Sequence, residues 1–167
     1  MNLVECEELV TDYVAWLKDS LTVECTGGAC EITMPFLDRH NDHLQIYVTK
    51  HEDRIHLSDD GYIVSDLRSA GLDLNTPKRT KTVQVILNGF DVRRDGNQLK
   101  SEATTDNFGQ KLHFFAQAML AMNELCVLAQ PRVATFFQED VRSFLDEAGV
   151  RYSPDVKLTR KSGFDHP

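Results

Sequence analysis

The sequence has little that would mark it for a membrane or for the commonest catalytic chemistries. No apolar run reaches the roughly 18 to 20 residues that span a bilayer, and the N-terminus, with Glu5, Glu7 and Glu8, lacks the positive head of a signal peptide. We therefore expect a cytoplasmic protein with no membrane segment. A GxSxG nucleophile elbow and a GxxxxGK phosphate loop are also absent from the sequence. This disfavours serine-based covalent catalysis and gives no sign of a small-molecule cofactor.

Cysteines are few, and their spacing does not suggest a metal site. The sequence has four, with no CxxC pair and no histidine pair at finger spacing, so a structural zinc site is poorly supported. Cys25 and Cys30 are near enough in sequence to bridge a small loop. In a reducing compartment, however, buried or half-buried free thiols are the commoner state, and this is the state we expect.

The chain has fewer positively charged than negatively charged side chains. The chain has 18 Lys and Arg against 26 Asp and Glu, a net charge of −8, which disfavours sequence-independent contact with nucleic-acid phosphates. Basic residues are interleaved with the acidic ones, so the charge indicates a solvated surface and not a mimic of DNA. A protein partner is therefore favoured over nucleic acid. The length of 167 residues suits one domain around a single core.

Hydrophobic periodicity predicts an α+β fold. We expect an antiparallel sheet built from hairpins, packed with four to five helices, two of them long and in the C-terminal half. The first helix has the three- and four-residue apolar spacing of an amphipathic helix. Helices are expected over residues 3–21, 65–71, 76–89, 108–130 and 133–149, and strands over 30–34, 44–49, 54–58, a segment through Tyr62 and Val64, and a hairpin over 90–103.

The two central strands should pair as an antiparallel hairpin. Their apolar residues can share one face if paired positions sum to an odd number. A four-residue loop, residues 50–53, satisfies this by pairing Val48 with Ile55, and it brings His43 towards Asp60. The residues expected in the core are Leu44, Ile46, Val48, Ile55 and Leu57.

The stretch PFLDRHNDHLQIYV, residues 35–48, sets two aspartates and two histidines directly before an alternating run. If the strand extended backwards, His40 and Asp42 would share the buried face with Leu44, and burying an unpaired charge costs several kcal/mol. We therefore expect residues 38–42 to form a turn or cap, unless these side chains are paired or bind a metal.

Two interpretations of these side chains are open. A divalent ion in phosphoryl chemistry prefers two or three carboxylates, sometimes with a histidine. The ligands would be Asp38, Asp42, His43 and Asp60, with Asp59 as a further carboxylate. His40 or His56 would then assist proton transfer. Asp, Asn and His at turns more often serve backbone hydrogen bonding, and we favour that interpretation.

A candidate binding surface consists of outward-facing residues and one basic cluster. In the predicted hairpin, Tyr47 and His56 face away from the core. The cluster PKRTK, residues 77–81, could contact phosphates, although a solvated first helical turn explains it equally well. The residues of this surface are His40, Tyr47, His56, Lys78, Arg79 and Lys81.

Three stretches carry a family resemblance: PFLDRHNDHLQIYV, HLSDDGYIVSDLRSAGLDL and NGFDVRRDGNQL. They resemble the bacterial and prophage family catalogued as domain of unknown function 1828. The resemblance implies a protein of prophages or mobile elements, acting in conflicts between phage and host. Longer members continue beyond KSGFDH, residues 161–166, into a domain that resembles a restriction endonuclease. It thus implies a single module over residues 1–152, with residues 153–167 resembling the start of a second domain that is absent here.

Two functions follow as hypotheses. The favoured one is a non-enzymatic interaction or regulatory module of a prophage or mobile-element protein that binds a protein partner and needs no cofactor. The alternative is a divalent-metal-dependent hydrolase acting on nucleic acid through the Asp and His residues between positions 38 and 60. No catalytic residue is implied by the resemblance.

Overall fold

The computed structural model describes residues 2–129 and 133–151. The chain divides into two compact units, Met1–Leu128 and Ala129–Pro167, and each is considered by itself. The tail over residues 153–167, expected to begin a second domain, lies outside the described residues. No helix among the described residues is both long and apolar enough to cross a membrane.

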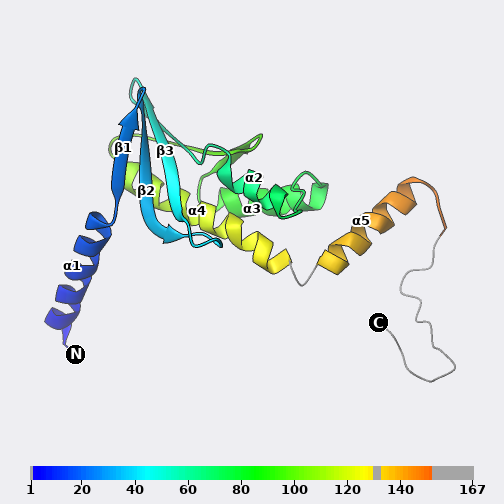
Figure 1. Cartoon of the computed structure of the whole chain (residues 1–167), viewed down its shortest axis with the longest axis horizontal. Helices are drawn as coiled ribbons and strands as arrows, with labels where there is room; N and C mark the ends of the chain where they lie inside the picture. Colours follow the sequence, from blue (N-terminus) through cyan, green and yellow to red (C-terminus); the bar gives the residue numbers. More distant parts are fainter. Residues whose placement is uncertain (1, 130–132, 152–167) are drawn as a thin grey trace. The chain divides into compact units, whose positions relative to one another are not determined.

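The first unit combines a six-stranded antiparallel sheet with four helices, which confirms the predicted α+β class (Figure 1). The strand order across the sheet is β1-β2-β3-β4-β6-β5. The second unit contains α5 (Val133–Glu147). The elements of the first unit are α1 (Leu3–Asp19), β1 (Thr22–Thr26), β2 (Ala29–Leu37), β3 (His43–His51), β4 (Arg54–Ser58), α2 (Tyr62–Ser69), α3 (Pro77–Asn88), β5 (Arg93–Asp95), β6 (Gln98–Ala103) and α4 (Phe108–Ala129).

The core lies between one face of the sheet and the helices α2, α3 and α4. Alternate residues of the strands point to this face, and α4 runs along it (Figure 1). Phe115, Met119 and Met122 of α4 are buried against the sheet residues. Of the five residues expected in the core, Leu44, Ile46 and Leu57 are buried and Val48 and Ile55 are half-buried. The residues that alternate with these along each strand point to the other face of the sheet.

The hairpin of β3 and β4 has the predicted direction but not the predicted register. Val48 pairs with Leu57 and His51 with Arg54, so paired positions still sum to an odd number, but the loop has two residues and not four. Glu52 adopts a φ of 54° in that loop. Positive φ at a central position is what a two-residue hairpin turn needs, and few residues other than Gly, Asn and Asp adopt it readily.

The strand expected through Tyr62 and Val64 is wrong, because both residues belong to α2. The helix begins three residues before the expected start at Ser65, since the Asp59 carboxylate accepts hydrogen bonds from the first backbone N–H groups and so stabilises an earlier start. The predicted end is confirmed: Gly71, just beyond the helix, has a φ of 85°.

The free-thiol prediction is wrong for one cysteine pair. β1 was not predicted, because only Val23 in this strand is a large apolar residue and all five positions are exposed. Its pairing with β2 sets Cys25 opposite Cys30, with their Cα atoms 4.0 Å apart and a disulfide between them. Cys6 and Cys126 are free, as expected.

Helix α1 forms as predicted, but its apolar face does not enter the core. A capping box between Asn2 and Glu5 fixes its start. No residue of α1 is buried in the structure, and Trp16 is 54% exposed. The amphipathic pattern therefore indicated the helix correctly, but it did not show where the apolar face would lie.

Candidate functional site

Residues 38–42 leave the sheet as a tight turn, as predicted. The Asp38 N–H donates to the Asp42 carbonyl at 2.9 Å. In return Asp38 Oδ1 accepts hydrogen bonds from the backbone N–H groups of His40 at 2.7 Å and Asp42 at 3.0 Å. Its other oxygen accepts the Tyr62 hydroxyl of α2. The buried Asp38 carboxylate thus organises the turn and ties it to the first turn of α2.

The electrostatics of this pair keep Asp38 charged and Tyr62 neutral. Burial alone would raise the pKa of Asp38, but the hydrogen bonds from Tyr62 and from the backbone of Asp42 and His40 outweigh it, so the pKa lies below its ordinary value. Burial and the adjacent Asp38 carboxylate raise the pKa of Tyr62. Tyr62 is therefore a hydrogen-bond donor at neutral pH and not a proton source.

A second carboxylate, Asp66 of α2, contacts the side chains of two residues in the same turn. Arg39 donates to it twice, from Nε to Oδ2 at 2.9 Å and from Nη2 to Oδ1 at 2.8 Å, a bidentate geometry. His40 Nε2 lies 2.9 Å from Asp66 Oδ1. The hydrogen bonds from Arg39 lower the pKa of Asp66 against the opposing effect of burial. Arg39 Nη1 also lies 2.6 Å from Cys126 Sγ, which joins the turn to α4.

Asp59, at the end of β4, is 1% exposed and fully hydrogen-bonded. Its carboxylate accepts the N–H groups of Gly61 at 2.9 Å, Ile63 at 3.0 Å and Leu99 at 2.8 Å. Burial raises the pKa of Asp59, and these three donors oppose that shift. One side chain therefore caps α2 and fastens β6 to β4.

A groove of about 830 Å³ lies on the open face of the sheet, between its strands and α2. It brings together three of the four residues predicted as metal ligands, which are Asp42, His43 and Asp60. His43 Nδ1 lies 3.1 Å from the Met34 carbonyl, which makes it the protonated nitrogen and leaves the lone pair on Nε2. The other lining residues are Thr33, Gln45, Tyr47, Asp59, Gly61, Tyr62, Ser65, Asp66 and Ser69.

The remaining predicted residues are dispersed. Asp38 is buried and does not line the groove. His56 lines a neighbouring hollow of about 350 Å³ that shares Tyr47 with the groove, and its Nδ1 lies 4.0 Å from Glu102. His40 is engaged with Asp66. The basic residues Lys78, Arg79 and Lys81 lie on α3 and line neither the groove nor the hollow.

The groove is acidic, but its side chains do not form a metal cage. Within residues 2–129 and 133–151, no group of three or more His, Cys, Asp and Glu side chains is placed to hold a metal ion. Asp42, His43 and Asp60 are exposed, whereas Asp59 and Asp66 are committed to intramolecular hydrogen bonds. The arrangement as it stands offers acceptor oxygens and one imidazole lone pair to solvent.

Sequence reasoning missed three residues of this site: Arg39, Tyr62 and Asp66. Tyr62 was assigned to a strand, and Arg39 meets Asp66 across 27 positions of sequence. An available signal was the spacing of Tyr62 and Asp66, since residues four apart share a face of a helix. It becomes informative only once α2 is known to begin at Tyr62.

Comparison with known proteins gives one family. The model of the family described as Domain of unknown function DUF1828 matches residues 34–122, which include the turn, every lining residue of the groove except Thr33, and most of α4. No curated protein matches the chain. No solved structure matches it either.

Proposed function

We propose, from the premise that the chain belongs to the family described as Domain of unknown function DUF1828, that it is a non-enzymatic interaction or regulatory module that binds a protein partner through α1. We place it, as part of this proposal, in the cytoplasm and in a prophage or mobile element. One observation carries the assignment: α1 has 17 residues and none of them is buried.

The exposed surface of α1 has the composition of a binding face. Apolar side chains three and four positions apart lie along one side of the helix, and Tyr13 and Trp16 stack with ring centroids 6.0 Å apart. Contiguous exposed apolar surface, and aromatic residues in particular, are typical of protein interfaces. The large exposed apolar residues of α1 are Leu3, Val4, Leu9, Val10, Tyr13, Val14 and Trp16.

The motif aspartates support a structural role for the turn. Asp38, Asp59 and Asp66 each accept two or more hydrogen bonds from within the protein. A carboxylate whose lone pairs are occupied in this way positions backbone and stabilises helix starts. This structural role of the three aspartates supports a function that involves no reaction.

A pair of matched variants tests the role of α1. Val10 lies on the apolar side of the helix, and Ala15 lies on the polar side. Val10→Glu and Ala15→Glu add the same charge to the same helix, so only Val10→Glu should weaken binding. A partner captured by the full chain from its host would be purified and titrated against each variant by calorimetry. We expect at least a tenfold weaker affinity for Val10→Glu, and equal affinities for the two variants would refute the proposal.

One observation favours a second candidate, the metal-dependent hydrolase acting on nucleic acid. Asp42, His43 and Asp60 line the same groove, and the contact to Met34 uses Nδ1 of His43, so Nε2 is the ring nitrogen that would bind a metal. This arrangement would require Asp42 and Asp60 to close on an ion that binds there.

Metal binding to the folded chain separates this candidate from the first. Mn²⁺ at 100 times its dissociation constant would stabilise the folded state by about 2.7 kcal/mol and raise the melting temperature. Asp42→Ala should abolish that rise, whereas Asp53→Ala, in the β3–β4 loop, should retain it. If Mn²⁺ and Mg²⁺ leave the melting temperature unchanged, the hydrolase is excluded.

A further inference from the structure

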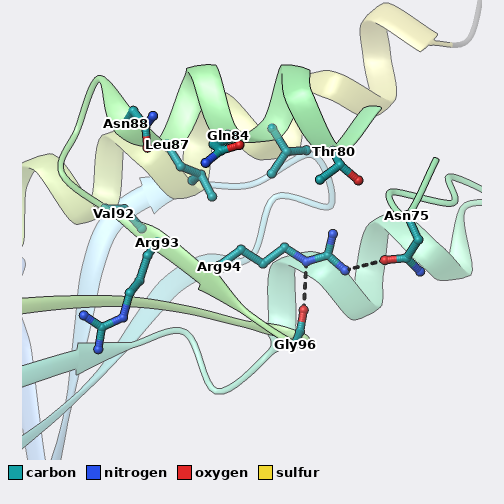
Figure 2. A pocket seen from close by; sticks show the side chains of 10 residues that line it. Asn75, Thr80, Gln84, Leu87, Asn88, Val92, Arg93, Arg94 and Gly96 are labelled. Carbon is teal, nitrogen blue, oxygen red and sulfur yellow. Dashed lines mark hydrogen bonds between the residues drawn. The ribbon is translucent and has the colours of Figure 1, made fainter. Parts of the chain in front are cut away.

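A second hollow lies away from the groove, between α3 and the hairpin of β5 and β6 (Figure 2). Its volume is about 470 Å³, within the range of pockets that hold small ligands or single side chains. Its inner surface is apolar, because Val83, Leu87 and Val92 are buried there. Its polar lining residues are Asn75, Thr80, Gln84, Asn88, Arg93 and Arg94.

Arg94 extends along this pocket and is held in place by neutral groups (Figure 2). Its Nε donates to the Gly96 carbonyl at 2.8 Å and its Nη2 to Asn75 Oδ1 at 2.9 Å. The third nitrogen, Nη1, has no hydrogen-bond acceptor within the part of the chain that the structure describes, and in Figure 2 it points into the pocket towards α3. A fixed guanidinium thus presents unused donors to an open space.

Several other cations of this unit have a carboxylate partner. Arg39 faces Asp66, and Lys100 lies 2.6 Å from Asp95. Arg93 also has a carboxylate, Glu102, at 3.0 Å, and its side chain turns away from the pocket in Figure 2. Arg94 is half-buried, yet both of its acceptors are neutral. A half-buried charge is ordinarily paired, so the missing counter-charge is a property of the pocket that a ligand can supply.

We propose that this pocket binds the carboxylate of an Asp or Glu side chain from a protein partner. A carboxylate accepts hydrogen bonds from a guanidinium with more favourable energy than a neutral oxygen does. The amide groups of Gln84 and Asn88 line the pocket beside Arg94 and can donate to the same anion. The methylene groups of the ligand would contact Leu87 and Val92. This site is separate from α1, so its failure would leave the proposed function standing.

Nucleic acid is the competing ligand, because Lys78 and Lys81 lie near one end of the same helix. Phosphate-backbone binding draws its affinity from several exposed cations along a surface. Here one recessed guanidinium is flanked by amides and an apolar floor, in a chain whose net charge is −8. These features fit one acidic side chain better than a polyanion.

The experiment uses the full chain labelled with ¹⁵N and follows the side-chain signals of Arg94 Nε–H, Gln84 and Asn88. The probes are the acetylated, methylamidated derivatives of aspartate and glutamate, with those of asparagine and glutamine as matched neutral controls. We expect saturable shifts at millimolar concentration with the two acids and none with the amides. Inorganic phosphate and a short single-stranded oligonucleotide are titrated in parallel.

Three variants test the location of the site. Arg94→Gln should weaken binding of the acids at least tenfold, which corresponds to about 1.4 kcal/mol, whereas Arg54→Gln, at an exposed position of β4 outside the pocket lining, should bind as the wild type does. Gln84→Glu, at an exposed position of α3, should also abolish binding by repulsion and is not expected to disturb folding. The proposal is overturned by equal shifts with acids and amides, by the absence of saturable shifts, by unchanged binding in Gln84→Glu, or by tighter binding of the oligonucleotide than of the acids.

Discussion

The substitution Asp59→Asn tests whether one buried carboxylate joins α2 to the sheet. Asp59 Oδ1 accepts from Gly61 and Leu99, and Oδ2 accepts from Ile63. Asparagine has nearly the same shape, so its oxygen can keep the first two hydrogen bonds, but its NH₂ group then faces the Ile63 N–H at about the same 3.0 Å. Two donors would meet in a buried site, and the helix would lose a negative charge at its N-terminus.

The expected loss follows from these changes. Breaking a hydrogen bond to a charged group and leaving a buried donor unsatisfied costs roughly 2 to 4 kcal/mol. A neutral asparagine costs less to bury than a carboxylate does, which offsets part of this loss. We therefore expect the free energy of unfolding to fall by about 2 to 3 kcal/mol. Urea unfolding followed by far-ultraviolet circular dichroism measures this change.

The matched control is the neighbouring substitution Asp60→Asn. Asp60 is exposed, its carboxylate accepts only a 3.3 Å hydrogen bond from Gln98 among the described residues, and its φ of 50° suits asparagine. Its free energy of unfolding should stay within about 0.5 kcal/mol of the wild type. If Asp59→Asn is equally mild, the reasoning about the buried carboxylate is refuted.

Two further predictions concern the turn and the sheet edge. Asp66→Asn should lower the free energy of unfolding by about 2 kcal/mol near neutral pH, because it leaves the Arg39 guanidinium without its carboxylate. Because the fold holds the pKa of Asp66 below the ordinary 3.8, this contribution is fully present well above pH 3.8 and is lost as the pH falls through the lower folded value. In urea titrations, the free energies of unfolding of the wild type and Asp66→Asn should therefore become equal in acid. A difference that persists below the folded and unfolded pKa values of Asp66 would contradict this. Reducing the Cys25–Cys30 disulfide should lower stability by at most ~2 kcal/mol, given the short loop that it closes, and a Cys25→Ser, Cys30→Ser double variant should not respond to reductant. If reductant leaves the melting temperature of the wild type unchanged, the prediction for the disulfide is refuted.

Local sequence patterns were sufficient for the elements whose signals are short-range. The helix over α3 is marked by Thr76, Pro77 and Gly89, and the β5–β6 turn by Asp95 and Gly96, so both were predicted. The odd pairing sum of β3 and β4 also followed from alternation alone, because only one parity places both apolar sets on one face.

Features set by distant contacts could not be predicted in the same way. The exact register of β3 and β4 depends on the conformation of Glu52, which is unfavourable for that residue in isolation. The early start of α2 depends on a buried acceptor, Asp59, which also serves a strand 40 positions away. The amphipathic pattern of α1 is the same whether the partner of its apolar face is the core or another protein.

The candidate site was predicted in part for a geometric reason. Asp42 precedes β3, His43 is its first residue and Asp60 follows β4, so an antiparallel pairing of these strands brings all three to the same end of the sheet. The bidentate pair of Arg39 and Asp66 could not be predicted, because the two residues are 27 positions apart in the sequence and no local pattern links them.

The most direct test of the central claim, that α1 is the binding face, is hydrogen exchange of the full chain with and without its purified partner. The account predicts that the backbone amides of Leu9–Trp16 become protected on binding while those lining the groove, such as Asp42 and Asp60, exchange at unchanged rates. Protection at the groove with none in α1 would contradict it.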